Sequence, residues 1–158
     1  MNVNGFEIER KFLIAMPEPA FLESCERSEI TQTYLLGEEN TTERVRKRAR
    51  GGDCEYTHTV KRKLSNMRRI EDERVIGAEE YEALLTRADP ARRTIEKTRC
   101  CFTRDGKLWE LDVFPFWQDR AFLEIDHDTG THIPAVIHEL NIQLTIAILS
   151  RLQVKLHF

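Results

Sequence analysis

Apolar and polar side chains alternate along most of this chain, which is the pattern of strands that bury one face. The alternating stretches are rich in β-branched and aromatic residues, and turn residues separate them. They predict eight strands, at residues 6–14, 30–36, 43–50, 54–61, 68–77, 93–103, 107–114 and 120–127. Gly51-Gly52-Asp53 and Asp105-Gly106 predict tight turns after the third and the sixth of these strands.

Helical spacing of apolar residues is limited to short segments. Residues 17–25 carry proline where a helix would begin, and residues 78–88 place Tyr81, Leu84 and Leu85 on one side of a helix. Residues 135–152 fit a strand and a helix equally well. Eight alternating strands in 158 residues, about the size of one domain, predict a barrel or a strongly curved sheet.

The polar faces of the predicted strands carry like charges in groups. Carboxylates occupy alternate positions in four strands, and Arg44, Arg46, Arg48 and Arg50 share one face of the third. The commonest meaning of a charged face is simple exposure to water. However, like charges two residues apart on a strand lie about 6.6 Å apart and repel unless something compensates them. A face that only provides solubility more often mixes the two signs.

The charged faces would point inward if helices covered the large apolar side chains of residues 107–114 and 120–127. The inward set would then comprise eight carboxylates and up to nine bases: Glu7, Glu9, Glu71, Glu73, Glu110, Asp112, Glu124 and Asp126, with Lys11, Arg44, Arg46, Arg48, Arg50, Lys61, Arg69, Lys97 and Arg99. Dry burial would cost several kcal/mol per unpaired ion. A wet cavity that binds metal and polyphosphate removes this conflict, because carboxylates suit Mg²⁺ or Mn²⁺ and bases suit phosphate.

Composition narrows the classes of function. The chain has 24 Lys and Arg against 27 Asp and Glu, a net charge of −3, which disfavours a nucleic-acid binder. A hydrophobic fraction of 41% is enough for a core. No apolar run has the length of a membrane helix and no signal peptide is visible, so we expect a cytoplasmic protein without a membrane partner. The four cysteines show no CxxC spacing.

Glu7-Ile8-Glu9-Arg10-Lys11 matches the ExExK signature of the CYTH superfamily, the triphosphate tunnel metalloenzymes. Further elements follow in the order that this superfamily shows: Gln32-Thr33-Tyr34-Leu35, Val45-Arg46-Lys47-Arg48, Thr59-Val60-Lys61, Arg69-Ile70-Glu71-Asp72-Glu73, Glu96-Lys97-Thr98-Arg99, Trp109-Glu110-Leu111-Asp112-Val113-Phe114 and Leu123-Glu124-Ile125-Asp126. Over residues 6–126 the chain therefore resembles this superfamily.

The resemblance implies one domain over residues 1–158, of α+β class and mainly β. Its fold would be an eight-stranded antiparallel closed barrel, the triphosphate tunnel, with helices packed outside. Members bind a triphosphate in the tunnel and need a divalent cation. The superfamily includes inorganic, thiamine and RNA triphosphatases and class IV adenylate cyclases, and the N-terminal stretch of this chain is most similar to the inorganic triphosphatases.

The resemblance also implies roles for individual residues. The metal ligands would be Glu7, Glu9, Glu124 and Asp126. Asp126, with Glu71 or Glu73, would hold a second metal or orient the attacking water, and Lys97 would join these catalytic groups. The phosphates would be bound by Lys11, Arg46, Arg48, Lys61, Arg69, Lys97 and Arg99. Glu110 and Asp112 would support the ligands, while Arg44 and Arg50 would lie at the tunnel mouths or on the surface.

Two departures from the superfamily pattern stand out. The eighth strand carries Glu124-Ile125-Asp126 where members usually have two glutamates. Residues 133–158 are poor in charge and lack the pattern that usually follows Ile-Pro, so how this tail would close the tunnel is left open. An exposed apolar tail can drive self-association, which makes a homodimer a state to test.

Hydrolysis of a triphosphate with Mg²⁺ or Mn²⁺, inorganic tripolyphosphate foremost, is the leading functional hypothesis. Phosphoryl transfer needs neutralisation of charge and positioning more than covalent chemistry, and no nucleophile or phosphate-binding loop motif is present. Adenylate cyclase chemistry in the same tunnel, a non-catalytic polyphosphate- or nucleotide-binding module, and a purely structural barrel are the alternatives.

Overall fold

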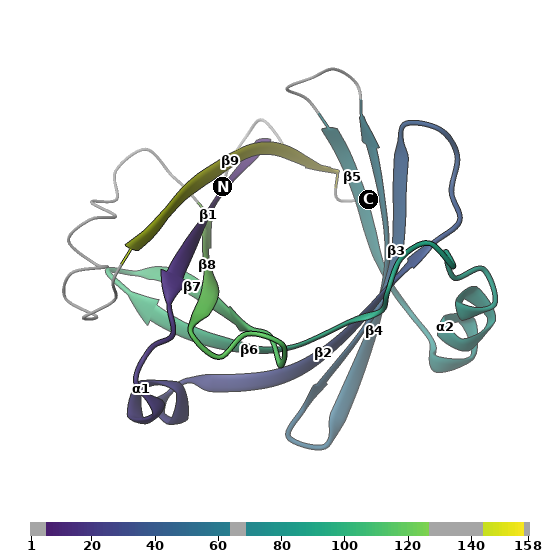
Figure 1. The fold of residues 1–158 in the computed structure, drawn as a ribbon. Coiled ribbons are helices and arrows are strands. Elements are labelled where there is room, and N and C mark those ends of the chain that lie inside the picture. The colour runs from purple at the N-terminus through teal and green to yellow at the C-terminus, as the bar shows by residue number, and fades with distance from the viewer. Residues whose placement is uncertain (1–5, 64–68, 127–143, 157–158) are drawn as a thin grey trace. The chain divides into compact units, whose positions relative to one another are not determined.

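The computed structural model describes residues 6–63, 69–126 and 144–156, and for residues 6–9, 69, 126 and 144–156 it describes the backbone alone. This part of the chain is mainly β, with nine strands and two helices (Figure 1). It forms two compact units. Of the described residues, the first holds 6–7, 29–63, 69–96 and 152–156, and the second holds 8–28, 97–126 and 144–151.

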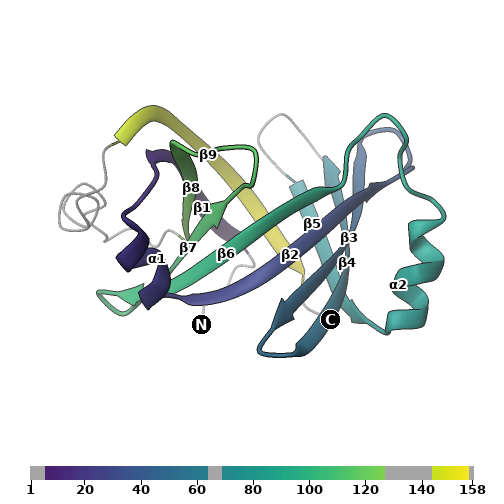
Figure 2. The ribbon, with the colours of Figure 1, turned by 60° about the horizontal axis from the view of Figure 1, so that its bottom comes forward.

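The first unit is an antiparallel sheet with one helix on it. Its strands pair in the order β2 (Glu26–Leu35), β3 (Thr41–Arg50), β4 (Asp53–Lys63) and β5 (Arg69–Ile76), and α2 (Ala78–Leu85) follows. Both views show α2 on one side of β3 and β4 (Figures 1 and 2). Tyr81 of α2 packs there on Leu35, Val45 and Ile76, so α2 covers an apolar part of this sheet face.

The second unit repeats this plan with other elements. Its strands pair antiparallel in the order β1 (Phe6–Ala15), β8 (Arg120–Asp126), β7 (Lys107–Val113) and β6 (Ile95–Arg104), and α1 (Pro19–Ser24) begins with a proline. The core contains Trp109, Leu111 and Leu123, each fully buried, and Phe21 and Leu22 of α1 pack against it. The covered face is again the apolar one.

The turn between β6 and β7 has the backbone that its sequence predicts. Asp105 and Gly106 have φ values of 52° and 70°. Two successive positive φ values match the twist of a two-residue hairpin, which is why Asp-Gly is favoured there. This turn sets the register that pairs Arg99 with Asp112 and Cys101 with Glu110.

The expected mainly β, antiparallel architecture is confirmed. Each of the eight predicted strands is present within a few residues of its expected bounds, and both predicted helices are found. In the ambiguous tail, β9 (Leu144–Leu156) is a strand that pairs in parallel with β5, with Val154 opposite Ile70. Residues 135–143 lie outside the described residues. Among the residues that the structure describes, no helix has the length and apolar character needed to cross a membrane.

Truncating a core residue of the second unit tests this packing. Ile125→Val is expected to lower the free energy of unfolding by about 0.5–1.5 kcal/mol, because it removes one methylene from a side chain that is 1% exposed. Urea unfolding measures the change. The matched control is Leu108→Val, since Leu108 is 55% exposed and its truncation should change stability by less than about 0.5 kcal/mol. Equal effects of the two variants would contradict the packing.

Candidate functional site

In both units, charged residues occupy the face opposite the helix. In the second unit the alternation of β6, β7, β8 and β1 puts Lys97 and Arg99, Glu110 and Asp112, Glu124, and Lys11 on that face, because their strand neighbours form the core under α1. The register pairs Glu110 with Glu124, and Lys11 with Glu124. Residues from four strands therefore meet in one cluster, here called the Arg99 cluster.

The guanidinium of Arg99 is the centre of this cluster. Its Nε and Nη2 donate to the two carboxylate oxygens of Asp112 at 2.7 and 2.8 Å. Its Nη1 donates to Glu110 at 2.5 Å, and Nη2 also donates to Glu124 at 3.0 Å. Arg99 is 7% exposed and Asp112 is fully buried. One buried cation thus holds three carboxylates together.

Two lysines complete the Arg99 cluster. Lys97 Nζ donates to Asp112 Oδ2 at 2.5 Å, and Lys11 Nζ forms an ion pair with Glu124. Three cations then face three carboxylates in the described part of the cluster. Because these charges balance, a polyanion that enters it would bring uncompensated negative charge and would favour the binding of a further cation.

Burial and pairing shift the pKa values of this cluster in different directions. Burial lowers the pKa of Lys97 to about 8, although Asp112 opposes the shift. Burial would raise the pKa of Asp112, but its hydrogen bond from Arg99 and the charge of Lys97 lower it to about 2. Burial would also raise the pKa of Glu124, but the charges of Lys11 and Arg99 lower it below its usual value. At neutral pH Asp112 and Glu124 are therefore ionised, and Lys97 is close to losing its proton.

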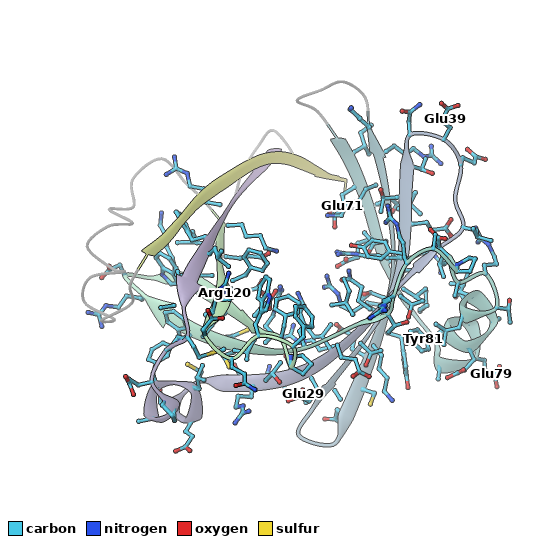
Figure 3. The ribbon with its side chains drawn as sticks, viewed as in Figure 1. Glu29, Glu39, Glu71, Glu79, Tyr81 and Arg120 are labelled. Atoms are coloured by element: carbon cyan, nitrogen blue, oxygen red, sulfur yellow. The ribbon has the colours of Figure 1, made fainter. Side chains whose placement is uncertain are left out.

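A second group of charges lies on the first unit, on the sheet face away from α2. Arg44 Nη1 and Arg46 Nη2 donate to Gln32 Oε1 at 3.0 and 3.4 Å. Arg44 Nη2 lies 3.8 Å from Glu71 and 3.9 Å from Glu73. Figure 3 shows Glu71 on the side of β5 away from α2. This group is called the Arg44 cluster.

Strand β4 supplies the remaining members of the Arg44 cluster. Lys61 Nζ lies 2.8 Å from Glu71 Oε2, and Thr59 Oγ1 donates to Glu73 at 2.8 Å. Glu71 is only 3% exposed, so its charge depends on these basic partners. Within the described residues, Arg44 Nε and Thr57 Oγ1 are buried without a hydrogen-bond partner. Both atoms can donate, so the face can accept an oxyanion.

The arginine row of β3 continues from this cluster to the β3–β4 hairpin. An open cavity of about 510 Å³ lies there, lined by Arg48, Arg50, Gly51, Asp53, Cys54 and Glu55. Arg48 and Arg50 therefore lie on the same strand as Arg44 and Arg46 but line the hairpin end of the face. The basic row is continuous along one strand.

Several predicted site residues are described by their backbone alone. Glu9 lies opposite Asp126 in the β1–β8 ladder, and Arg69 begins β5. Glu7 is in β1. Of the four predicted metal ligands, Glu124 is the one whose side chain is described, and the described side chains contain no group of three His, Cys, Asp or Glu arranged to hold a metal. The Glu9–Asp126 register nevertheless adds carboxylate-bearing positions next to the Lys11–Glu124 pair.

Three members of the Arg44 cluster lie outside the phosphate-binding and catalytic sets that the resemblance implies. Arg44, expected at a mouth or on the surface, is a central member of its cluster, with a side chain 14% exposed. Gln32 and Thr59 also bind charged partners there. The alternation already placed Thr59 on the face of Lys61, and the β3–β4 register sets Arg44 opposite Thr59. The alternation of side chains along β3 and β4 was thus the sequence signal that could have placed these residues in the cluster.

Comparisons with known proteins give likenesses in structure alone. No family model matches the chain, and no curated protein matches it. A proposed adenylate cyclase from Bacillus halodurans has a TM-score of 0.61 and 11% identity, over 90% of this chain and 95% of that one. A conserved hypothetical protein from Pyrococcus furiosus has a TM-score of 0.58 and 22% identity, over 85% of this chain and 90% of that one. The PH1819 protein from Pyrococcus horikoshii has a TM-score of 0.53 and 21% identity, over 84% of this chain and 86% of that one.

The chain has the fold of these solved structures. The identities are low, so the likeness concerns the fold. Within this fold, the helix of each unit packs on the core residues of its sheet, and the charged cluster lies on the opposite face.

Proposed function

We propose that this protein hydrolyses a triphosphate compound in a reaction that depends on Mg²⁺ or Mn²⁺. The observation that carries the proposal is the Arg99 cluster, in which buried bases and carboxylates alternate on one sheet face. Phosphoryl transfer requires bases that hold phosphate oxygens and carboxylates that hold metal and water. The Arg44 cluster, with its buried donors on Arg44 and Thr57, offers the same chemistry.

The carboxylate oxygens of these clusters suit a hard divalent cation as metal ligands. Glu124 would hold the metal together with Glu7, Glu9 and Asp126, whose positions adjoin one another along β1 and β8. Such a cation supplies Lewis-acid stabilisation of phosphate oxygens when it is bound. Glu110 and Asp112 keep Arg99 in place and so support the neighbouring Glu124.

Different basic residues of the chain would bind different phosphate oxygens. Lys11 and Lys97 each carry a mobile ammonium group, whereas the arginines offer planar forks. The proposed set comprises Lys11, Arg46, Arg48, Lys61, Arg69, Lys97 and Arg99, to which the structure adds Arg44 as a candidate. Asp126, with Glu71 or Glu73, would orient the attacking water and accept its proton.

Closure of the strands into the tunnel is part of this proposal. In a closed barrel both charged faces would line one interior, and the two helices would lie outside. The proposal is supported by the equal placement of helix and charge in each unit. A crystal structure of the protein with tripolyphosphate and Mn²⁺ tests it, and phosphate bound outside the two clusters would contradict it.

Product analysis tests the proposed reaction. Purified protein is assayed with tripolyphosphate, ATP and thiamine triphosphate, each with Mg²⁺ and with Mn²⁺. We expect release of phosphate from at least one of them that stops when EDTA removes the metal. No metal-dependent release from any of the three would reject hydrolysis.

Adenylate cyclase chemistry is the second candidate, because one solved structure of this fold is a proposed adenylate cyclase. Cyclic AMP and pyrophosphate from ATP would identify it, whereas hydrolysis gives ADP and phosphate. Tight triphosphate binding without any turnover would instead identify a non-catalytic binding module. The same product assay, combined with calorimetry, separates these outcomes.

Binding of tripolyphosphate is expected to weaken as pH rises through about 8. Lys97, whose pKa burial lowers to about 8, is a cation below this pH and loses its positive charge above it. Calorimetry in the absence of metal at pH 7 and pH 9 measures the effect. Lys97→Arg is the matched variant, since an arginine stays charged at both values and should remove most of the pH dependence. An equal decline in both proteins would assign the titration to another group.

A further inference from the structure

Four aromatic residues at the β7–β8 connection lie apart from the core of the second unit. Phe114 follows β7, Phe116 and Trp117 lie in the connection, and Phe122 lies in β8. None of them belongs to the core under α1, which is built from the opposite strand faces. Phe122 shares its strand face with Glu124, and the register sets it opposite Asp112. The rings therefore adjoin the Arg99 cluster.

The rings form a partly open cluster, here called the aromatic cluster. Phe114 lies 5.3 Å from Phe116, 5.4 Å from Trp117 and 6.0 Å from Phe122, between ring centroids. Phe114 is 8% exposed, but Phe116 is 66% exposed. Trp117 and Phe122 are half-buried. The four rings thus pack on one another and still expose ring surface that a ligand can contact.

Two lysines join the aromatic cluster to the Arg99 cluster. Lys11 Nζ, which pairs with Glu124, lies 4.7 Å from the centroid of the Phe122 ring. Lys97 Nζ, which binds Asp112, lies 6.0 Å from the centroid of Phe114. A phosphate chain held by these ammonium groups would therefore begin beside aromatic surface. This continuity favours a ligand that combines a polyanion with a flat apolar ring.

We propose that the aromatic cluster stacks the base of a nucleoside triphosphate whose phosphates occupy the Arg99 cluster. This inference rests on the proposed function and narrows its substrate class. Stacking on aromatic rings suits any nucleobase, because every base has a flat π-surface. The two lysines already provide positive charge to Phe114 and Phe122, and a cationic ring such as the thiazolium of thiamine triphosphate would be repelled there.

Comparative calorimetry tests the inference with ATP and tripolyphosphate as probes, each with Mg²⁺. Phe116→Ala is the main variant, since Phe116 is 66% exposed and its loss should not unfold the protein. We expect ATP to bind about tenfold more weakly to this variant and tripolyphosphate to bind as in the wild type. The matched control is Leu108→Ala, a truncation of another exposed apolar residue in the same unit, which should change neither affinity. Thiamine triphosphate should bind no more tightly than tripolyphosphate.

Tryptophan fluorescence gives a second readout that does not depend on turnover. Trp109 is fully buried, so a stacked base would quench Trp117. ATP is expected to quench the wild-type signal, and Trp117→Phe should abolish the quenching. Undetectable ATP binding, or equal losses of ATP and tripolyphosphate affinity in Phe116→Ala, would overturn the stacking site. Absence of hydrolysis with selective ATP binding would reject the proposed reaction and leave the stacking site intact.

Discussion

Asp112→Asn is expected to destabilise the protein more than any other single polar substitution considered above. Asp112 is fully buried and accepts hydrogen bonds from Arg99 and Lys97. Asparagine keeps the shape but removes the negative charge, which leaves two buried cations without their main partner. We expect the free energy of unfolding to fall by about 3–5 kcal/mol, measured by urea unfolding at pH 7.

The control for this substitution is Asp119→Asn. Asp119 also pairs with an arginine, Arg120, but its side chain is 68% exposed. Because water screens this pair, its loss should leave the unfolding midpoint unchanged. An Asp112→Asn midpoint equal to that of the wild type would show that the Arg99 cluster does not form as described.

The same residue predicts a dependence of stability on pH. The pKa of Asp112 is about 2 in the folded protein, below its ordinary value of 3.8. The stabilisation by ionised Asp112 is therefore fully present above about pH 4 and is lost as pH falls through 2. Acid unfolding of the wild type should contain this component, and Asp112→Asn should lack it.

Glu124→Gln is expected to reduce metal-dependent triphosphate hydrolysis by at least about a hundredfold. Glutamine is nearly isosteric but keeps one acceptor oxygen, so the change removes a charged oxygen ligand together with one of the two hydrogen bonds that Lys11 and Arg99 donate to Glu124. Initial rates across a Mn²⁺ titration measure the effect, and we expect both a lower maximal rate and a higher requirement for Mn²⁺. Thermal unfolding checks that the variant is folded.

The control for Glu124→Gln is Glu79→Gln on α2. Glu79 is exposed and lies on the helix, away from the charged sheet face (Figure 3). Its substitution changes the net charge of the protein by the same amount and should leave the rate unchanged. A Glu124→Gln enzyme with the wild-type rate and the wild-type Mn²⁺ dependence would reject Glu124 as a metal ligand.

The strands were predictable because strand alternation is a local property of the chain. Every second residue of a strand lies on the same face. The residues around Lys97, Trp109 and Leu123 therefore predict the charged and apolar faces of β6, β7 and β8. The tail differs, because the apolar residues of 135–152 fit a strand and a helix equally well. The parallel pairing of β9 with β5 could not be foreseen for the same reason.

Partner choice within the clusters was not predictable, because it depends on register between strands. The sequence places Arg99 on the same face as Asp112 and Glu110, but only the β6–β7 ladder sets Arg99 opposite Asp112. Likewise, Arg44 fell outside the matched motif although its register position opposite Thr59 places it within its cluster. His58 lies on the opposite face of β4 from Thr59, because successive residues of a strand alternate, and its Nε2 lies 2.8 Å from Glu43 Oε1.

The Asp105-Gly106 turn has a consequence for the order of folding. Arg99 and Asp112 are 13 residues apart on one hairpin, so their contact closes a short loop. The contact between Lys11 and Glu124 spans 113 residues, and closing this longer loop costs about 2 kcal/mol more in chain entropy. Since local contacts form faster, we expect the β6–β7 hairpin to assemble Arg99 with its carboxylates early and Lys11 to join late. The Arg99 cluster would then act as a folding nucleus as well as the proposed binding site.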